Sequence, residues 1–223
     1  DNALNQQLAS ELLSDAGLLV DIAGNGEIAV DRVQTCGYDL VLMDMQMPVL
    51  DGVSATRAIR ALPGKRDLPI VAMTANAMLA DRERCREAGM VDFVVKPIDP
   101  DTLFLTLLRW IKPTGATPEA VGIQTADIPP GGDLNLGGVD IDVAAGLRRV
   151  LGKHTLYLDL LHSYLAGQRP LLSQLRAALA MGKLEKAELL AHSCKGMSAT
   201  IGADTIAQAA DALEQALRAN RPL

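Results

Sequence analysis

The chain has 223 residues and a formal net charge of −6, with 49 % hydrophobic but only 3 % aromatic residues. This length accommodates one large domain or two modest ones, with a core built mainly from aliphatic side chains. No apolar run approaches the roughly 20 residues of a membrane span, and the clustered Lys and Arg of a nucleic-acid footprint are missing. Three widely spaced cysteines indicate neither a disulfide framework nor a metal site, which favours a cytoplasmic protein.

The first 112 residues alternate helical and strand patterns. Leu4, Leu8 and Leu12, spaced four residues apart, predict a first helix that stops at Gly17. Short apolar runs predict strands at 18–23, 38–43, 69–73 and 92–95, and periodic stretches predict helices at 26–34, 53–62, 77–88 and 102–111. Such alternation favours a parallel sheet with helices on both faces.

The remaining residues divide into two regions. Residues 113–138 are rich in Pro and Gly and are predicted to be a linker between a domain at 1–112 and a domain at 139–223. The second domain is helical throughout, with helices expected at 143–150, 155–169, 171–181, 184–197 and 205–218. Short turns between amphipathic helices predict an antiparallel bundle. Residues 1–138 carry 11 basic and 19 acidic side chains, whereas residues 139–223 carry 10 and 8, an asymmetry that could help the two domains associate.

Three polar residues of complementary chemistry follow predicted strands. They are Asp44, Thr74 and Lys96, and function in open parallel sheets collects beyond the carboxyl ends of the strands. Asp44 can act as a nucleophile on phosphorus, Thr74 can donate a hydrogen bond to a phosphoryl oxygen, and Lys96 can neutralise its charge. Such chemistry also calls for Mg²⁺. A single polar residue at a strand end can simply mark where the strand reaches water, but three of complementary type favour a site.

The sequence around these residues is familiar. Asp1-Asn2, NGEIAV at 25–30, YDLVLMDMQMPVLDG at 38–52, PIVAMTANAM at 69–78 and AGMVDFVVKPI at 88–98 closely resemble response-regulator receiver domains. The resemblance implies a flavodoxin-like sheet of strand order 2-1-3-4-5 and phosphorylation of Asp44, supported by Thr74 and Lys96. It also implies that Phe93 is the aromatic switch residue and that the bond before Pro97 is cis.

The resemblance further implies a Mg²⁺ site made by Asp1, Asp44 and the backbone carbonyl of Gln46. Receiver domains have a strand before the position of Asp1, and this first strand is missing here, so the natural protein is expected to continue upstream. A haloacid-dehalogenase-like phosphatase also uses an aspartyl nucleophile after a strand. Its pattern needs a second Asp two residues later, where this chain has Gln46, so that alternative is rejected.

One of the three histidines has the surroundings of a phosphoryl acceptor. In AHSCKGMSATIGA at 191–203, Lys195 and Gly196 share a helix face with His192. An acceptor on a helix needs an exposed imidazole nitrogen, a nearby cation and a small neighbour that lets a partner approach. Glycine inside a helix costs up to about 1 kcal/mol relative to alanine, so its presence here asks for a reason. His154 and His162 lack such neighbours and are expected on a solvated or half-buried face.

The segment around His192, with GLRRVLGKHTLYLDLLHSYL at 146–165 and ADALEQAL at 210–217, resembles histidine phosphotransfer domains, which are four-helix bundles. The resemblance implies phosphorylation of His192 with Lys195 and Gly196 in support. Cys194 replaces the leucine usual in that pattern and is expected to act as a small buried hydrophobe.

A receiver, a linker and a phosphotransfer domain follow one another at the carboxyl end of hybrid sensor histidine kinases. The resemblance implies a relay from a kinase core in the same polypeptide to Asp44, then to His192 and to a separate response regulator. No glycine-rich ATP lid is present, so the chain is expected to carry phosphate without a kinase core of its own. The parent protein could be anchored in the inner membrane. The alternative is a receiver that regulates by docking while His192 serves a separate relay.

Overall fold

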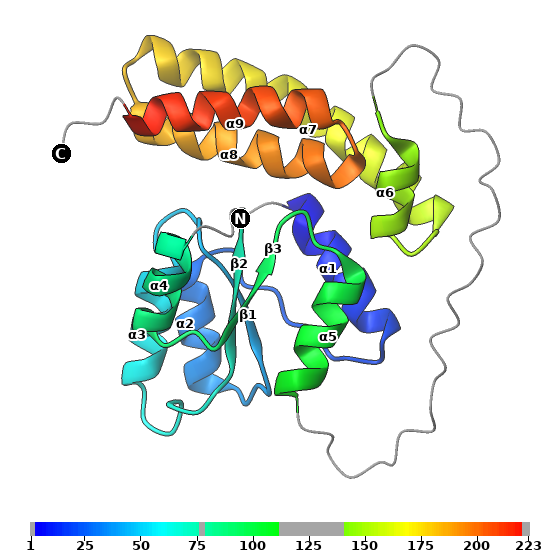
Figure 1. The fold of residues 1–223 in the computed structure, drawn as a ribbon. Helices are drawn as coiled ribbons and strands as arrows, with labels where there is room; N and C mark the ends of the chain where they lie inside the picture. Colours follow the sequence, from blue (N-terminus) through cyan, green and yellow to red (C-terminus); the bar gives the residue numbers. More distant parts are fainter. Residues whose placement is uncertain (1–2, 76–78, 112–140, 220–223) are drawn as a thin grey trace.

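The computed structural model describes residues 3–75, 79–111 and 141–219, which form an α/β domain stacked against a helical bundle (Figure 1). The α/β domain contains α1 (Ala3–Asp15), α2 (Gly26–Thr35), β1 (Val41–Asp44), α3 (Gly52–Ala61), β2 (Ile70–Thr74), α4 (Leu79–Ala88), β3 (Asp92–Val95) and α5 (Pro100–Trp110). The bundle contains α6 (Val143–Arg149), α7 (His154–Ala180), α8 (Leu184–Ile201) and α9 (Asp204–Ala219). The expected pairing of a flavodoxin-like domain with a four-helix bundle is confirmed.

The sheet is parallel, with strand order β1-β2-β3. Helices α2, α3 and α4 lie on one side of it, and α1 and α5 lie on the other (Figure 1). Each side has its own hydrophobic cluster, one around Ile59 and Ile70 and the other around Val71 and Leu103. Because all strands run the same way, their carboxyl ends reach one edge of the sheet, and this edge faces the bundle.

The strand predicted at residues 18–23 is not present. Residues 18–23 form no ladder, Leu19 is fully exposed, and a groove of about 730 Å³ is lined by this segment and by β1. A strand is stabilised by hydrogen bonds to a neighbouring strand, and residues 18–23 are not part of the three-stranded sheet. The observed strands therefore match only the 3-4-5 part of the expected order. An additional strand from upstream stays a prediction.

The helices predicted at 155–169 and 171–181 form a single helix, α7. Helix α7 continues through Pro170, although proline lacks the N–H that the helix ladder uses. Pro170 lies on the exposed face, while Leu171 and Leu175 after it are buried in the bundle, so their packing keeps the helix continuous. Helix α8 extends beyond its predicted end to Gly202, which adopts the left-handed conformation (φ 88°) favoured by glycine.

Helix α1 joins the two domains. Ala9 and Leu13 pack into the core of the α/β domain, whereas Leu8 and Leu12 are fully buried in the core of the bundle. The first helix predicted from the leucine spacing is therefore confirmed, but Leu8 and Leu12 pack into the core of the second domain. Within the three described ranges, no helix is both long and apolar enough to cross a membrane.

Candidate functional site

Asp44 lies at the carboxyl end of β1 and is 5 % exposed. Its carboxylate pairs with the Lys96 ammonium and accepts a hydrogen bond of 3.2 Å from the backbone N–H of Gln46. A buried carboxylate would be costly without such partners. The cation comes from the residue after β3, a strand that is separated from β1 by β2. The structure thus brings Asp44 and Lys96 together as the sequence predicted.

Thr74 and Lys96 are held beside Asp44 by the register of the sheet. Thr74 ends β2, the strand paired with β1, and is buried. The backbone N–H of Lys96 donates to the carbonyl of Thr74 at 2.7 Å, which fixes the lysine at the same edge. The Lys96-Pro97 bond is cis, as expected.

The other receiver-type residues are placed less completely. Phe93 is half-buried in β3, and the Arg82 guanidinium lies over its ring at 4.0 Å from the centroid. Asp1, expected as a metal ligand, lies outside the described residues. The described residues contain no group of three or more His, Cys, Asp or Glu side chains that could hold a metal ion.

His192 lies within α8 and is only 4 % exposed. The expectation of an exposed imidazole is wrong for this arrangement, because the ring lies where the bundle meets the α/β domain. Its Nδ1 is 3.1 Å from Oε1 of Glu214 on α9. A carboxylate only accepts hydrogen bonds, so this contact assigns the proton to Nδ1 and leaves the lone pair on Nε2 for chemistry.

Glu214 is a residue of this site that the sequence reasoning missed. It is 2 % exposed, accepts from Arg218 at 2.6 Å, and lies 3.6 Å from the Lys195 ammonium. Burial raises its pKa, but the hydrogen bond from His192 and the favourable electrostatic interactions with His192, Lys195 and Arg218 outweigh burial and lower the pKa to about 2. A signal was available, because Glu214 interrupts the buried stripe Ala207, Ala210, Leu217 at helical spacing.

The residues after His192 lie as predicted. Lys195 also pairs with Asp211 at 2.5 Å. Gly196 faces α1, where an added Cβ would stand 3.4 Å from the side-chain nitrogen of Asn5. Cys194 is buried in the hydrophobic core of the bundle, and His154 and His162 are exposed, as expected.

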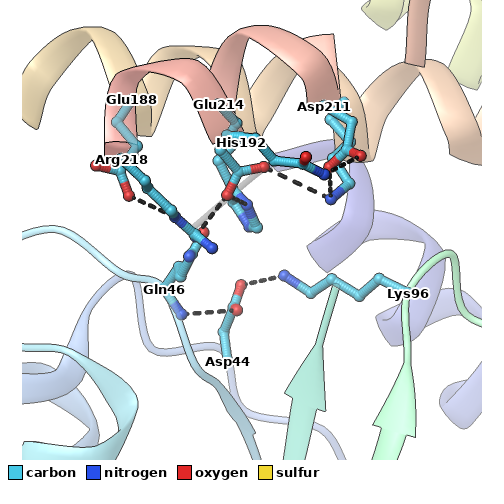
Figure 2. A network of polar contacts seen from close by, with 10 residues as sticks. Asp44, Gln46, Lys96, Glu188, His192, Asp211, Glu214 and Arg218 are labelled. Atoms are coloured by element: carbon cyan, nitrogen blue, oxygen red, sulfur yellow. Dashed lines mark hydrogen bonds and ion pairs between the residues drawn. The ribbon is translucent and has the colours of Figure 1, made fainter. Parts of the chain in front are cut away.

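The two groups of residues meet at one gap between the domains. Figure 2 shows the Asp44 carboxylate and the His192 ring directed into this gap from opposite sides. A pocket of about 230 Å³ there is lined by both domains, including Lys96, Pro97, His192, Lys195 and Gly196. Chemically, the gap holds a carboxylate and an imidazole as nucleophiles and two lysines that can neutralise an anion.

Comparisons with known proteins assign both domains. Residues 1–108 match the family model of the response regulator receiver domain, and residues 159–223 match that of the Hpt domain. The signal transduction histidine-protein kinase BarA of Shigella flexneri is 32 % identical over 98 % of this chain and 23 % of its own length. The sensor protein GacS of Pseudomonas syringae pv. syringae is 34 % identical over 100 % of this chain and 24 % of its own length.

Several solved structures are similar to part of the chain, and one of them is a receiver domain. It is the receiver domain of sensor histidine kinase PA1611 from Pseudomonas aeruginosa PAO1, with a magnesium ion coordinated in its active-site cleft. It is 45 % identical, covers 50 % of this chain and 91 % of that chain, and has a TM-score of 0.48.

The chain is a receiver domain followed by a histidine phosphotransfer domain, and it belongs to the two-component phosphorelay proteins. It spans about a quarter of the length of the curated histidine kinases that it matches.

Proposed function

We propose that the chain receives a phosphoryl group on Asp44 and passes it to His192 of the same chain, from which it moves to a separate receiver domain. The observation that carries this proposal is the shared gap: the Asp44 carboxylate and the His192 ring are directed into it (Figure 2). Lys96 and His192 also line one pocket. Holding two reacting groups in place converts a bimolecular step into an effectively unimolecular one.

The first transfer forms an acyl phosphate. A carboxylate oxygen of Asp44 attacks phosphorus of a donor phosphohistidine, an O–P bond forms, and the P–N bond of the donor breaks as its nitrogen recovers the electron pair. The ammonium of Lys96 neutralises charge on the phosphoryl oxygens, and the hydroxyl of Thr74 donates a hydrogen bond to them.

The second transfer uses the tautomer that Glu214 selects. The Nε2 lone pair of His192 attacks phosphorus, the N–P bond forms, and the O–P bond breaks to regenerate the Asp44 carboxylate. The imidazole becomes cationic in this step, and the Glu214 carboxylate on Nδ1 stabilises that charge, as a buried carboxylate does for the imidazolium of a catalytic triad. Lys195 lines the same pocket as His192, and its ammonium can neutralise charge on the phosphoryl oxygens as the group reaches His192.

The donor set beside Asp44 fits Mg²⁺, which binds oxygen ligands and commonly uses one or two carboxylates together with substrate phosphates. The Asp44 carboxylate and the Gln46 carbonyl would hold the ion, joined by Asp1. Bound Mg²⁺ would offset the repulsion between the carboxylate and an anionic phosphodonor.

The relatives support the proposed partners. We assign the donor to a kinase core in the same polypeptide, since the chain matches about a quarter of two histidine kinases. The acceptor is the receiver of a response regulator, and the relay operates in the cytoplasm.

The test locates phosphate on the full chain after incubation with Mg²⁺ and a phosphorylated kinase core. Acyl phosphate is base-labile and phosphohistidine is acid-labile, so the two sites are distinguishable. We expect acid-labile phosphate on His192 that disappears in Asp44→Asn, whereas the exposed control Asp31→Asn retains it. Undiminished labelling of His192 in Asp44→Asn would overturn the proposed order.

The alternative function, a docking receiver beside an independent His192, is separated by mixing two chains. One carries Asp44→Asn and the other His192→Gln, with His162→Gln as the matched control. Tethering gives an effective concentration in the millimolar range, so at micromolar protein the mixture should label His192 at least about tenfold more slowly than the intact chain. Equal rates would mean that transfer within one chain is not used.

A further inference from the structure

Lys195, the cation proposed to meet the phosphoryl group at His192, is already paired with carboxylates. Its ammonium nitrogen is 2.5 Å from Oδ1 of Asp211 and 3.6 Å from Oε2 of Glu214, and both acidic residues belong to α9. An ammonium has three donors but a single charge to share among its acceptors. A phosphoryl oxygen that reaches Lys195 therefore competes with these two carboxylates.

The two carboxylates serve the site differently. Glu214 is buried and contacts Nδ1 of the His192 imidazole directly. The Asp211 side chain is 35 % exposed, and its second oxygen accepts a hydrogen bond of 2.8 Å from the side-chain amide of Gln215. Asp211 lines the pocket together with Lys195 and His192, and Figure 2 shows it on the bundle side of the gap. Its contact with the site runs through Lys195.

The charge balance around His192 is acidic. Among the described residues, the ion pairs around the ring join the cations Lys195 and Arg218 to the carboxylates Glu188, Asp211 and Glu214. A phosphoryl group brings up to about two further negative charges near neutral pH. Sites that bind phosphate tightly surround it with cations and N–H donors. An additional carboxylate on the cation of this pocket is therefore expected to weaken its hold on a phosphoryl group.

We infer that Asp211 is a positioning residue that acts through Lys195: it shares the ammonium with the phosphoryl group on His192, keeps the phosphohistidine weakly stabilised and so favours onward transfer. Asp211 forms no bond to phosphorus. The ammonium divides its charge between the carboxylate and the phosphoryl oxygens, and without Asp211 the phosphoryl group would receive a larger share. The inference deepens the proposed function and rests on it in taking His192 as the phosphoryl acceptor.

The test measures how strongly His192 holds phosphate when no receiver aspartate takes part. The reference is the full chain with Asp44→Asn, equilibrated with phosphoramidate and excess ammonium, and phosphoramidate is small enough for the pocket of about 230 Å³. The Nε2 lone pair of His192 attacks phosphorus, a new N–P bond forms, and the P–N bond of phosphoramidate breaks as ammonia leaves with the electron pair. Because this exchange is reversible, the labelled fraction of His192, located by mass spectrometry under alkaline conditions, gives an equilibrium constant.

Removing the carboxylate should strengthen the hold on phosphate. Asp211→Asn, made in the reference chain, should raise the equilibrium constant by about fivefold, the upper range for a partly exposed ion pair. Asp211→Glu keeps the charge and should stay within about twofold of the reference. Asp204→Asn is the matched control, because Asp204 carries the same charge and lines the same pocket, and it should also change the constant by less than about twofold. High salt should reduce the effect of Asp211→Asn, since the pair is partly exposed.

A second pair of chains tests whether Asp211 acts through Lys195. Lys195→Met removes the ammonium, so adding Asp211→Asn to that chain should change the equilibrium constant by less than about twofold. An undiminished fivefold rise would mean that the carboxylate repels the phosphoryl group directly, and sharing of the ammonium would be wrong.

Three other results would overturn the inference. One is an equal equilibrium constant in the reference and Asp211→Asn chains. Another is an equal rise in Asp204→Asn, which would make the effect one of overall charge. The last is a lack of label on His192 in every chain, which would remove the acceptor role on which the inference rests. Label that rises with Asp211→Asn, beside a native chain that passes no phosphate from Asp44 to His192, would contradict the proposed relay alone.

Discussion

Asp44 and His192 are both buried, at 5 % and 4 % exposure, but the protein supports them with opposite charges. Asp44 is backed by a cation, Lys96, whereas His192 is backed by an anion, Glu214. The anion is in turn surrounded by Lys195 and Arg218. In the proposed transfer, Lys96 suits the anionic phosphoryl group that Asp44 would receive, and Glu214 suits the positive charge that the imidazole of His192 would develop.

The two folds place the charged partner beside Asp44 and His192 in different ways. In the receiver, the parallel sheet brings the carboxyl ends of its strands together. A polar residue that directly follows an apolar strand is therefore placed beside those of the other strands. In the bundle, the partner comes from a second helix, and its side chain must occupy a core position to reach the imidazole. The carboxylate site is therefore fixed by backbone register, and the imidazole site by side-chain packing.

Removing the cation behind Asp44 should have the largest effect. Lys96→Ala leaves a buried carboxylate without its counter-charge and leaves the incoming phosphoryl oxygens without a neutralising group. We expect labelling of Asp44 by acetyl phosphate with Mg²⁺ to slow by roughly 10²–10³-fold. Lys65→Ala is the control, since Lys65 bonds the Cys36 carbonyl instead. A slowing of less than about threefold would show that Lys96 does not serve the phosphoryl group.

The next largest effect is on stability in acid, where protonation of Glu214 removes the anion beside His192. The pKa of Glu214 is lowered from 4.5 to about 2 in the fold, so its stabilising contribution is present above pH 4.5 and lost as pH falls through about 2. A shift of this size corresponds to roughly 3 kcal/mol. The difference in unfolding free energy between the native chain and Glu214→Gln, measured by urea titration, should shrink over this interval. A difference that stays constant would contradict the buried ion pairs.

The approach of the receiver to His192 should depend on the size of residue 196. Gly196→Ala adds a Cβ at ordinary contact distance from Asn5, and it should stabilise α8 by up to about 1 kcal/mol without loss of relay. Gly196→Leu projects into α1 and should slow transfer from Asp44 to His192 by about tenfold through displaced geometry. Rapid-quench measurement of the two labels compares the variants. Equal rates for alanine and leucine would mean that α1 does not approach this face.

The smallest expected effect is on the rate at which His192 accepts the phosphoryl group. Glu214→Gln keeps an oxygen acceptor for the Nδ1 proton but removes the charge that stabilises the imidazolium. We expect transfer to slow by about fivefold, and Glu214→Ala, which also loses the tautomer, to slow more. If glutamine and alanine behaved alike, hydrogen bonding to Nδ1 would be irrelevant and only charge would matter.

The sequence predicted well wherever a local pattern was sufficient. Asp44, Thr74 and Lys96 each end an apolar run, and the three strands that carry them form where expected. The spacing of Lys195 and Gly196 from His192 likewise defines one helix face. The prediction of a strand at 18–23 was wrong because a strand forms only when a neighbouring strand accepts and donates its hydrogen bonds. The predicted helix break at Pro170 was wrong because the buried leucines after it pack in the bundle and keep the helix continuous.

What the sequence by itself determined is the two fold classes and the places of Asp44, Thr74 and Lys96 at strand ends and of His192 on a helix, because these follow from short-range periodicity; the phosphoryl-handling roles proposed for these residues come from the family resemblance. The tertiary structure alone decided that Glu214 supports His192 and that Leu8 and Leu12 belong to the bundle core. It also decided that His192 is covered. These features join residues as far apart as Asn5 and Thr200, and no local pattern encodes a contact that depends on how two domains pack.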